Sequence, residues 1–148
     1  MNGVVGDYLE EKQNPLAISV QCRTLPTTVN NNCGDVTEMQ KHQQSSISPT
    51  SSKRLLLLIH GSCNSPQDWS QEGHNHGIAL SNALYYNPLI LHYNNGLHIS
   101  DNGLLLAQSI HELVDDNNES DQEITITIVA HSMGGLVARS ACHYAAQL

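Results

Sequence analysis

A serine, Ser132, stands between an apolar stretch and an Ala-rich stretch in the segment IVAHSMGGLVARS, residues 128–140. A serine hydroxyl attacks a carbonyl carbon when a base removes its proton and when its side chain stands clear of the backbone. A sharp strand-to-helix turn meets the second condition if small residues stand two positions before and two after the serine. Ala130 and Gly134 occupy those positions, and Gly135 is a further small neighbour. The pattern Gly-x-Ser-x-Gly, present here as Ala-His-Ser-Met-Gly, therefore predicts a nucleophile elbow at Ser132.

A second Gly-bearing turn, His60-Gly61-Ser62, follows the apolar run LLLLI. Acyl transfer passes through a tetrahedral oxyanion, and each backbone N–H aimed at that oxygen contributes about 3–4 kcal/mol. One donor is expected to be the amide of Met133, after the nucleophile, and the other the amide of Ser62. Gly61 allows the backbone to approach closely. His60 and His131 each precede a functional residue, and we expect them to shape the turns rather than to transfer protons.

Three apolar stretches alternate with three stretches of helical spacing. KRLLLLIHG predicts a strand buried on both faces, and PLILHY and ITITIVA predict two more. HGIALSNALYY, DNGLLLAQSIHELVDD and GGLVARSACHYAAQ predict helices. The second helix is expected to turn Leu105, Ile110, Leu113 and Val114 inward.

This alternation predicts an α/β fold, in which parallel strands are joined by right-handed crossovers and helices flank the sheet. In such a sheet the ligand crevice lies at the carboxyl ends of the strands. Both Gly-bearing turns are expected there. Residues 1–52 are rich in Asn, Gln, Ser and Thr. They predict a polar, disordered leader, within which LAISV (16–20) could form one strand, ahead of an α/β domain over residues 53–148.

Charge and composition exclude several classes of protein. Six Lys and Arg residues against fourteen Asp and Glu residues give a net charge of −8, which argues against nucleic acid or an anionic membrane surface as a partner. Four cysteines without CxxC spacing favour free thiols in the cytoplasm. The first residues lack the basic and apolar regions of a signal peptide, and LLLLI is too short to span a bilayer. We expect a cytoplasmic chain, with peripheral membrane contact left open.

Taken together, LLLLIHGSCNSPQDW, HNHGIAL, LILHYNNGLHISDNG and VAHSMGGLVARSACHYA resemble the α/β-hydrolase superfamily. Within it they are most similar to lipases and esterases of the GPI inositol-deacylase-like group. The resemblance covers about residues 54–148, the N-terminal half of such a domain. It implies Ser132 as the nucleophile, Met133 and Ser62 as oxyanion-hole donors, and a carboxylic or lipid ester as the substrate. It implies no cofactor and no metal, but an acidic residue and a histidine after the serine.

The sequence after Ser132 departs from that pattern. It contains no Asp or Glu, and its only histidine is His143. A helix rises by about 1.5 Å per residue, so His143 would lie about 16 Å from the start of its helix, out of reach of Ser132. We therefore expect either a fragment of a longer enzyme or a truncated, inactive relative that binds a lipid or a protein. The unpaired outer edge of the last strand would favour self-association.

Other candidate residues have more than one interpretation. His74 and His76 form an H-x-H pair that a metal-dependent hydrolase could use, but no third ligand stands close by, so capping or loop packing is favoured. His98 is expected either in the crevice or as a plain loop residue. Asp101 is expected to be a helix N-cap, and Trp69 a core or crevice-wall residue.

Overall fold

The computed structural model describes residues 11–12, 18–25, 54–116 and 123–148. The three strands and three helices predicted within residues 53–148 are present close to their expected positions, together with β1 and a small hairpin. In chain order the elements are β1 (Gln21–Thr24), β2 (Arg54–Ile59), the 3-10 helix η1 (Pro66–Trp69), β3 (Ser70–Gln71), β4 (His74–Asn75), α2 (His76–Leu84), β5 (Asn87–His92), α3 (Ile99–Asp116), β6 (Thr125–Ala130) and α4 (Met133–Ala145).

The main sheet has the strand order β1-β5-β2-β6. Strands β5, β2 and β6 are parallel, which confirms the predicted fold class. Strand β1 pairs antiparallel with β5, with Cys22 opposite Leu91. The sequence allowed a strand at residues 16–20, but the observed strand begins at Gln21. Residues 13–17 lie outside the described residues. Part of the predicted leader therefore belongs to the sheet, because its backbone pairs with β5.

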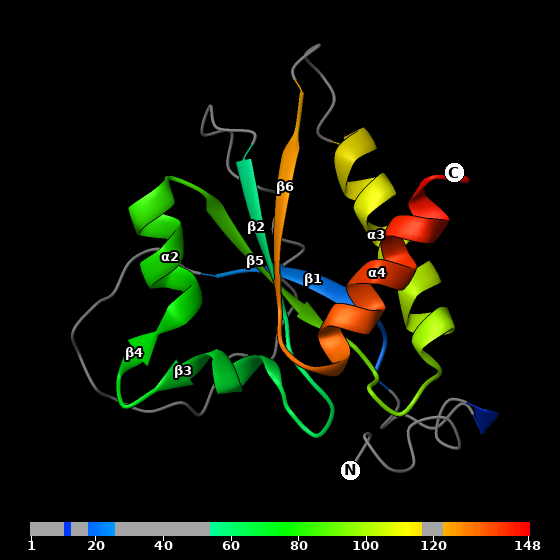
Figure 1. Ribbon diagram of the computed structural model, residues 1–148, viewed down its shortest axis with the longest axis horizontal. Helices are drawn as coiled ribbons and strands as arrows, with labels where there is room; N and C mark the ends of the chain where they lie inside the picture. Colours follow the sequence, from blue (N-terminus) through cyan, green and yellow to red (C-terminus); the bar gives the residue numbers. More distant parts are fainter. Residues whose placement is uncertain (1–10, 13–17, 26–53, 117–122) are drawn as a thin grey trace.

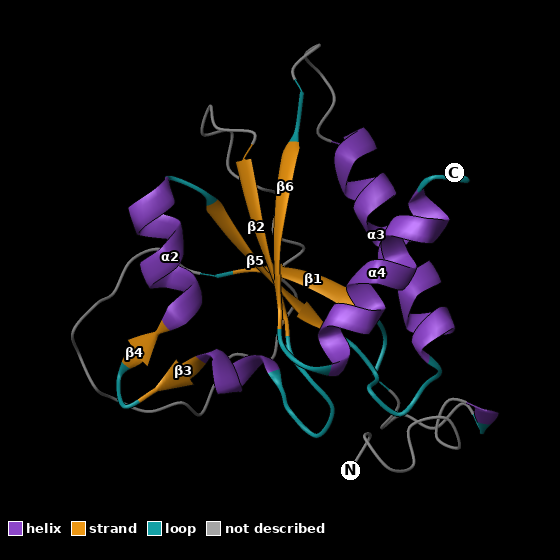
Figure 2. Ribbon diagram, in the orientation of Figure 1, coloured by secondary structure: helices purple, strands orange, loops and turns teal. Residues whose placement is uncertain are grey.

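Strand β2 lies at the centre of the sheet and is covered on both faces (Figure 1). Leu55, Leu57 and Ile59 pack with the buried residues of α3 and α4. Leu56 and Leu58 point to the other face, where partly buried residues of η1 and α2 pack against them. Figure 2 shows the resulting three layers, with α2 on one side of the sheet and α3 and α4 on the other. The unbroken apolar run is thus explained by burial on both faces.

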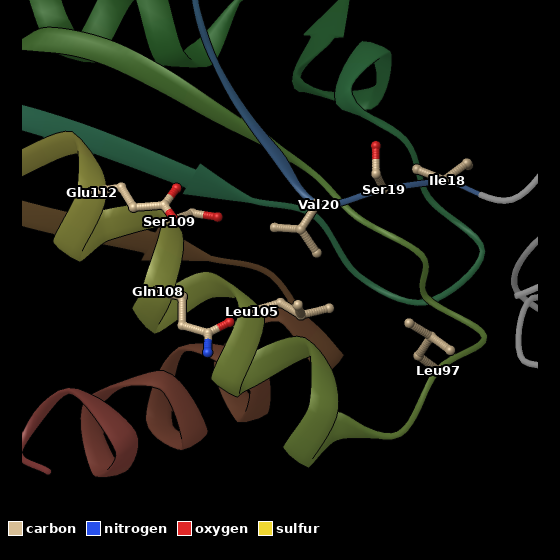
Figure 3. A pocket seen from close by; sticks show the side chains of 8 residues that line it. All are labelled: Ile18, Ser19, Val20, Leu97, Leu105, Gln108, Ser109 and Glu112. Atoms are coloured by element: carbon tan, nitrogen blue, oxygen red, sulfur yellow. The ribbon is translucent and has the colours of Figure 1, made fainter. Parts of the chain in front are cut away.

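The inner face of helix α3 differs from the predicted one at Leu105. Leu106 and Ala107 are buried in the core, whereas Leu105 is 37% exposed. Leu105 instead lines a cavity of about 250 Å³ together with Ile18 and Val20 of the N-terminal segment (Figure 3). The prediction was wrong at Leu105 because α3 packs against α4 as well as the sheet, and the spacing of apolar residues alone does not include the contact with α4.

Two further predictions for α3 can be compared with the structure. Ile110 and Leu113 pack against the core as expected. Asp101 lies in the first turn of α3, which begins at Ile99, so it is not the N-cap.

No helix in the described part of the chain combines the length and the apolar character needed to cross a membrane.

The contact between α3 and α4 depends on Gly103. A Cβ atom at this position would overlap the side chain of Ser140 and lie 3.0 Å from its backbone carbonyl carbon. We expect Gly103→Ala to lower the free energy of unfolding by about 1–3 kcal/mol, although alanine has the better helix propensity. Chemical denaturation would measure the loss. The double variant with Ser140→Gly should recover part of the stability, and equal losses in both backgrounds would contradict this account.

Candidate active site

Ser132 occupies a strained turn between β6 and α4. Its backbone angles are φ 53° and ψ −123°, a region that residues other than glycine rarely adopt. Such a conformation costs about 1–3 kcal/mol and persists where the surrounding structure enforces it, often at functional sites. A serine that only capped a helix would be extended and would accept a hydrogen bond through its side chain. Ser132 makes no side-chain capping bond and is exposed, so its hydroxyl projects from the turn unused by α4.

Gly134 allows α4 to begin directly against β2. A Cβ atom at Gly134 would lie 2.6 Å from the carbonyl oxygen of His60 and 2.7 Å from that of Ile59. No atom of the described residues lies within 4 Å of the corresponding position at Gly135. The sequence pattern predicted that both glycines support the turn. In the structure the steric requirement for a small residue falls on Gly134.

The two predicted turns lie side by side at the carboxyl ends of β2 and β6. The backbone N–H of His131 donates to the carbonyl oxygen of Ile59 at 2.9 Å, which holds the start of the elbow beside the end of β2. At Gly61 a Cβ atom would lie 2.9 Å from His131 Nδ1 and 3.0 Å from Ser132 Cβ. Gly61 therefore permits the first loop to pass beside the serine.

The two backbone amides expected in the oxyanion hole flank this contact. Met133 begins α4, and Ser62 follows Gly61 in a turn closed by a bond of 3.3 Å from Asn64 N–H to the Gly61 carbonyl. Cys63 in this turn has a positive φ of 60°. Within the described residues, neither the Ser62 nor the Met133 amide donates to another group. Both amides are thus free for an anionic oxygen, and their role remains a prediction.

His60 is buried and its imidazole is engaged beneath the first turn. It is 3% exposed, and Nδ1 donates to the Gly61 carbonyl oxygen at 3.0 Å. Nε2 is buried and has no hydrogen-bond partner among the described residues. Burial lowers the pKa of His60, more than its bond to Gly61 and the nearby Asp68 raise it, so the ring is neutral near pH 7. Its position supports the predicted shaping role.

Several buried polar residues around the first turn were not singled out from the sequence. Tyr93 and Asn94 follow β5 directly, and Asn102 lies on α3; all three are buried. Asn95 and Gly96 form a turn, closed by a bond of 3.1 Å from Leu97 N–H to the Asn94 carbonyl oxygen. The sequence contained one signal for Tyr93 and Asn94. They directly follow a buried strand, and residues at the end of a parallel strand lie at the same sheet edge as the elbow.

Among the described residues, no hydrogen bond joins Ser132 to the other candidate histidines, His74, His76, His98 and His143. His143 lies on α4, where its Nε2 is 3.0 Å from Gln147 Nε2. His98 is exposed at the start of α3, and its carbonyl oxygen accepts from Asn102 N–H. The rings of His74 and His76 lie 4.8 Å apart, but the helix cap is Asn75 between them, whose Oδ1 accepts from Ile78 N–H. Among the described residues no three His, Cys, Asp or Glu side chains are grouped to hold a metal.

Comparison with known proteins identifies a family and a similar fold. Residues 49–148 match the sequence model of the family described as "Putative serine esterase (DUF676)". No curated protein matches the chain. The crystal structure of Bacillus licheniformis lipase BlEst2 in its mature form is similar over 67% of this chain and 38% of that chain, with 23% identity and a TM-score of 0.51. The propeptide form of the same lipase is similar over 66% of this chain and 20% of that chain, with 23% identity and a TM-score of 0.50.

The two glycines after Ser132 provide a matched test of the elbow. Gly134→Ala forces α4 away from the carbonyls of His60 and Ile59, and we expect it to lower the free energy of unfolding by at least about 2 kcal/mol. Gly135→Ala enters open space and should raise that energy by up to about 1 kcal/mol through helix propensity. Thermal and urea unfolding would compare the two. Equal effects would show that the close contact of Gly134 does not hold in solution.

Proposed function

Because the chain belongs to the serine esterase family whose sequence model it matches, we propose that it is a lipase- or esterase-type hydrolase that cleaves carboxylic esters through Ser132. The observation that carries this proposal is the backbone of Ser132. It is held at φ 53° between a parallel strand and a helix, with a hydroxyl that caps nothing. A strained serine in this setting is what a nucleophile elbow requires.

The proposed reaction forms and breaks an acyl-enzyme. Ser132 Oγ attacks the ester carbonyl while a histidine takes its proton, and the amides of Ser62 and Met133 stabilise the oxyanion. The histidine then protonates the leaving alcohol, and water releases the acid in a second, equivalent step. Because His143 lies in the last turn of α4, beside Gln147, we propose that another histidine and an acidic partner activate Ser132. The resemblance to inositol deacylases makes a lipid ester a candidate substrate.

A fluorophosphonate probe tests the nucleophile directly, because it reacts with activated serines. In a protein that contains the proposed histidine and acid, we expect labelling at Ser132, found by mass spectrometry of the labelled peptide, and its loss in Ser132→Ala. Ser100→Ala, at an exposed serine of α3, is the matched control and should keep full labelling. Hydrolysis of p-nitrophenyl esters should fall by about 10³-fold or more in Ser132→Ala. Labelling that survives Ser132→Ala would refute the assignment.

The same chain also supports a non-catalytic role as a binding module, and one observation favours it. Strand β6 ends the sheet order and pairs only with β2 among the described strands. An open edge presents unpaired N–H and C=O groups to another chain. We therefore propose, as the second candidate, that two copies associate through β6.

Sedimentation velocity over a range of concentrations would test association through β6. Thr125 is exposed at the start of this strand, and a lysine on an edge strand opposes edge-to-edge pairing. We expect Thr125→Lys to shift the protein toward the monomer, whereas Asn82→Lys, an exposed change on α2, should not. A protein that is monomeric at every concentration would contradict the second candidate without affecting the first.

A further inference from the structure

The peptide unit between Gly61 and Ser62 is held through its carbonyl oxygen. Gly61 O accepts from His60 Nδ1 at 3.0 Å and from the Asn64 amide at 3.3 Å. Asn95 Nδ2 approaches the same oxygen at 3.5 Å. The peptide is planar and trans, so its C=O and its N–H point in opposite directions. Donors that hold the Gly61 carbonyl on one side therefore direct the Ser62 N–H to the other.

Tyr93 fixes the preceding peptide and the ring of His60 at once. Its hydroxyl donates to the His60 carbonyl oxygen at 2.8 Å, a short bond in a buried setting. Its ring stacks on the His60 imidazole with centroids 4.5 Å apart. Tyr93 is itself 1% exposed, and burial raises its pKa to about 12, so the hydroxyl remains a donor at neutral pH. The imidazole that holds Gly61 is thus held in turn by Tyr93.

Asn95 spans the first turn from one end to the other. Besides Gly61 O, its Nδ2 donates to the Asn64 carbonyl oxygen at 3.3 Å. Both bonds are long, so each is weak alone, but together they join the ends of the turn. The segment that carries Asn95 is anchored by α3, because Asn102 Nδ2 donates to the Asn94 carbonyl oxygen at 2.8 Å.

We propose that Tyr93, His60 and Asn95 are positioning residues that orient the Ser62 N–H toward the oxyanion above Ser132. None of them touches the reacting atoms, and each acts through a backbone carbonyl of the first turn. The inference rests on the proposed function, since it assigns the Ser62 amide to the oxyanion hole. The loop after β5 would then be part of the active site, although it contributes no group to the chemistry.

The orientation of the Ser62 N–H can be measured without any substrate. Tyr93→Phe removes the hydroxyl and keeps the ring, and Asn95→Asp replaces the donor by an oxygen that repels both carbonyls. In each variant we expect the residual dipolar coupling of the Ser62 N–H to change, while the couplings of α2 stay the same. Asn82→Asp adds the same charge at an exposed position of α2 and should leave the Ser62 coupling unaltered. An unchanged Ser62 coupling in both folded variants would overturn the proposal.

Ester hydrolysis gives the second measurement. A misdirected oxyanion donor weakens only the transition state, so kcat should fall with KM unchanged. We expect about a 10- to 100-fold fall in kcat for either variant, less than the roughly 10²- to 10³-fold loss on deleting an oxyanion-hole donor. A changed coupling with unchanged kcat would also overturn the assignment. If no ester is hydrolysed and Ser132 is not labelled, the proposed function fails, and the coupling alone decides whether these residues orient Ser62.

Discussion

The close approach of two backbone turns at the carboxyl ends of β2 and β6 is the constraint on which the rest of the structure depends. Gly134 leaves no space for a side chain against the carbonyls of β2, and Gly61 leaves almost none beside Ser132. Two adjacent parallel strands must end in register for this contact to form, and Ile59 pairs with Ala130 at its base. The elbow and the first loop are therefore one steric unit, in which neither turn can shift without moving the other.

The contact between the two turns requires a central strand that is buried on both faces, and this explains the apolar residues of β2. Strand β2 carries the first loop, and it can lie between β5 and β6 only if both of its faces are covered. Its leucines alternate between the two cores, and its pairing with β6 continues to the residue before the elbow. A rigid strand on which a loop is mounted positions that loop more accurately than loop contacts alone would. The hydrophobic core thus acts on the site through the placement of Gly61.

The sequence was sufficient for the elements and for the two turns, because unbroken apolar runs, helical spacing and paired small residues are local signals. It was insufficient at Leu105, whose exposure depends on how α3 meets both the sheet and α4. It did not reveal β1, because a four-residue strand of mixed polarity is recognisable only through its partner β5. The support around Tyr93 and Asn95 was also missed, since side-chain bonds to a distant backbone leave no period in the sequence.

Several features of the corner formed by the elbow and the first turn lower the stability of the fold, and this favours a functional origin for their geometry. Ser132 adopts a backbone conformation that costs about 1–3 kcal/mol, and His60 Nε2 and Asn102 Oδ1 are buried without a partner among the described residues. Each feature lowers stability, as do Trp69 Nε1 and Ser81 Oγ, which are also buried without a partner among the described residues but lie on η1 and α2. A corner selected only for stability would place glycine at position 132 and apolar side chains at positions 60 and 102. The core residues of β2 and α4 offset these losses, as expected where a stable scaffold holds a reactive serine in place.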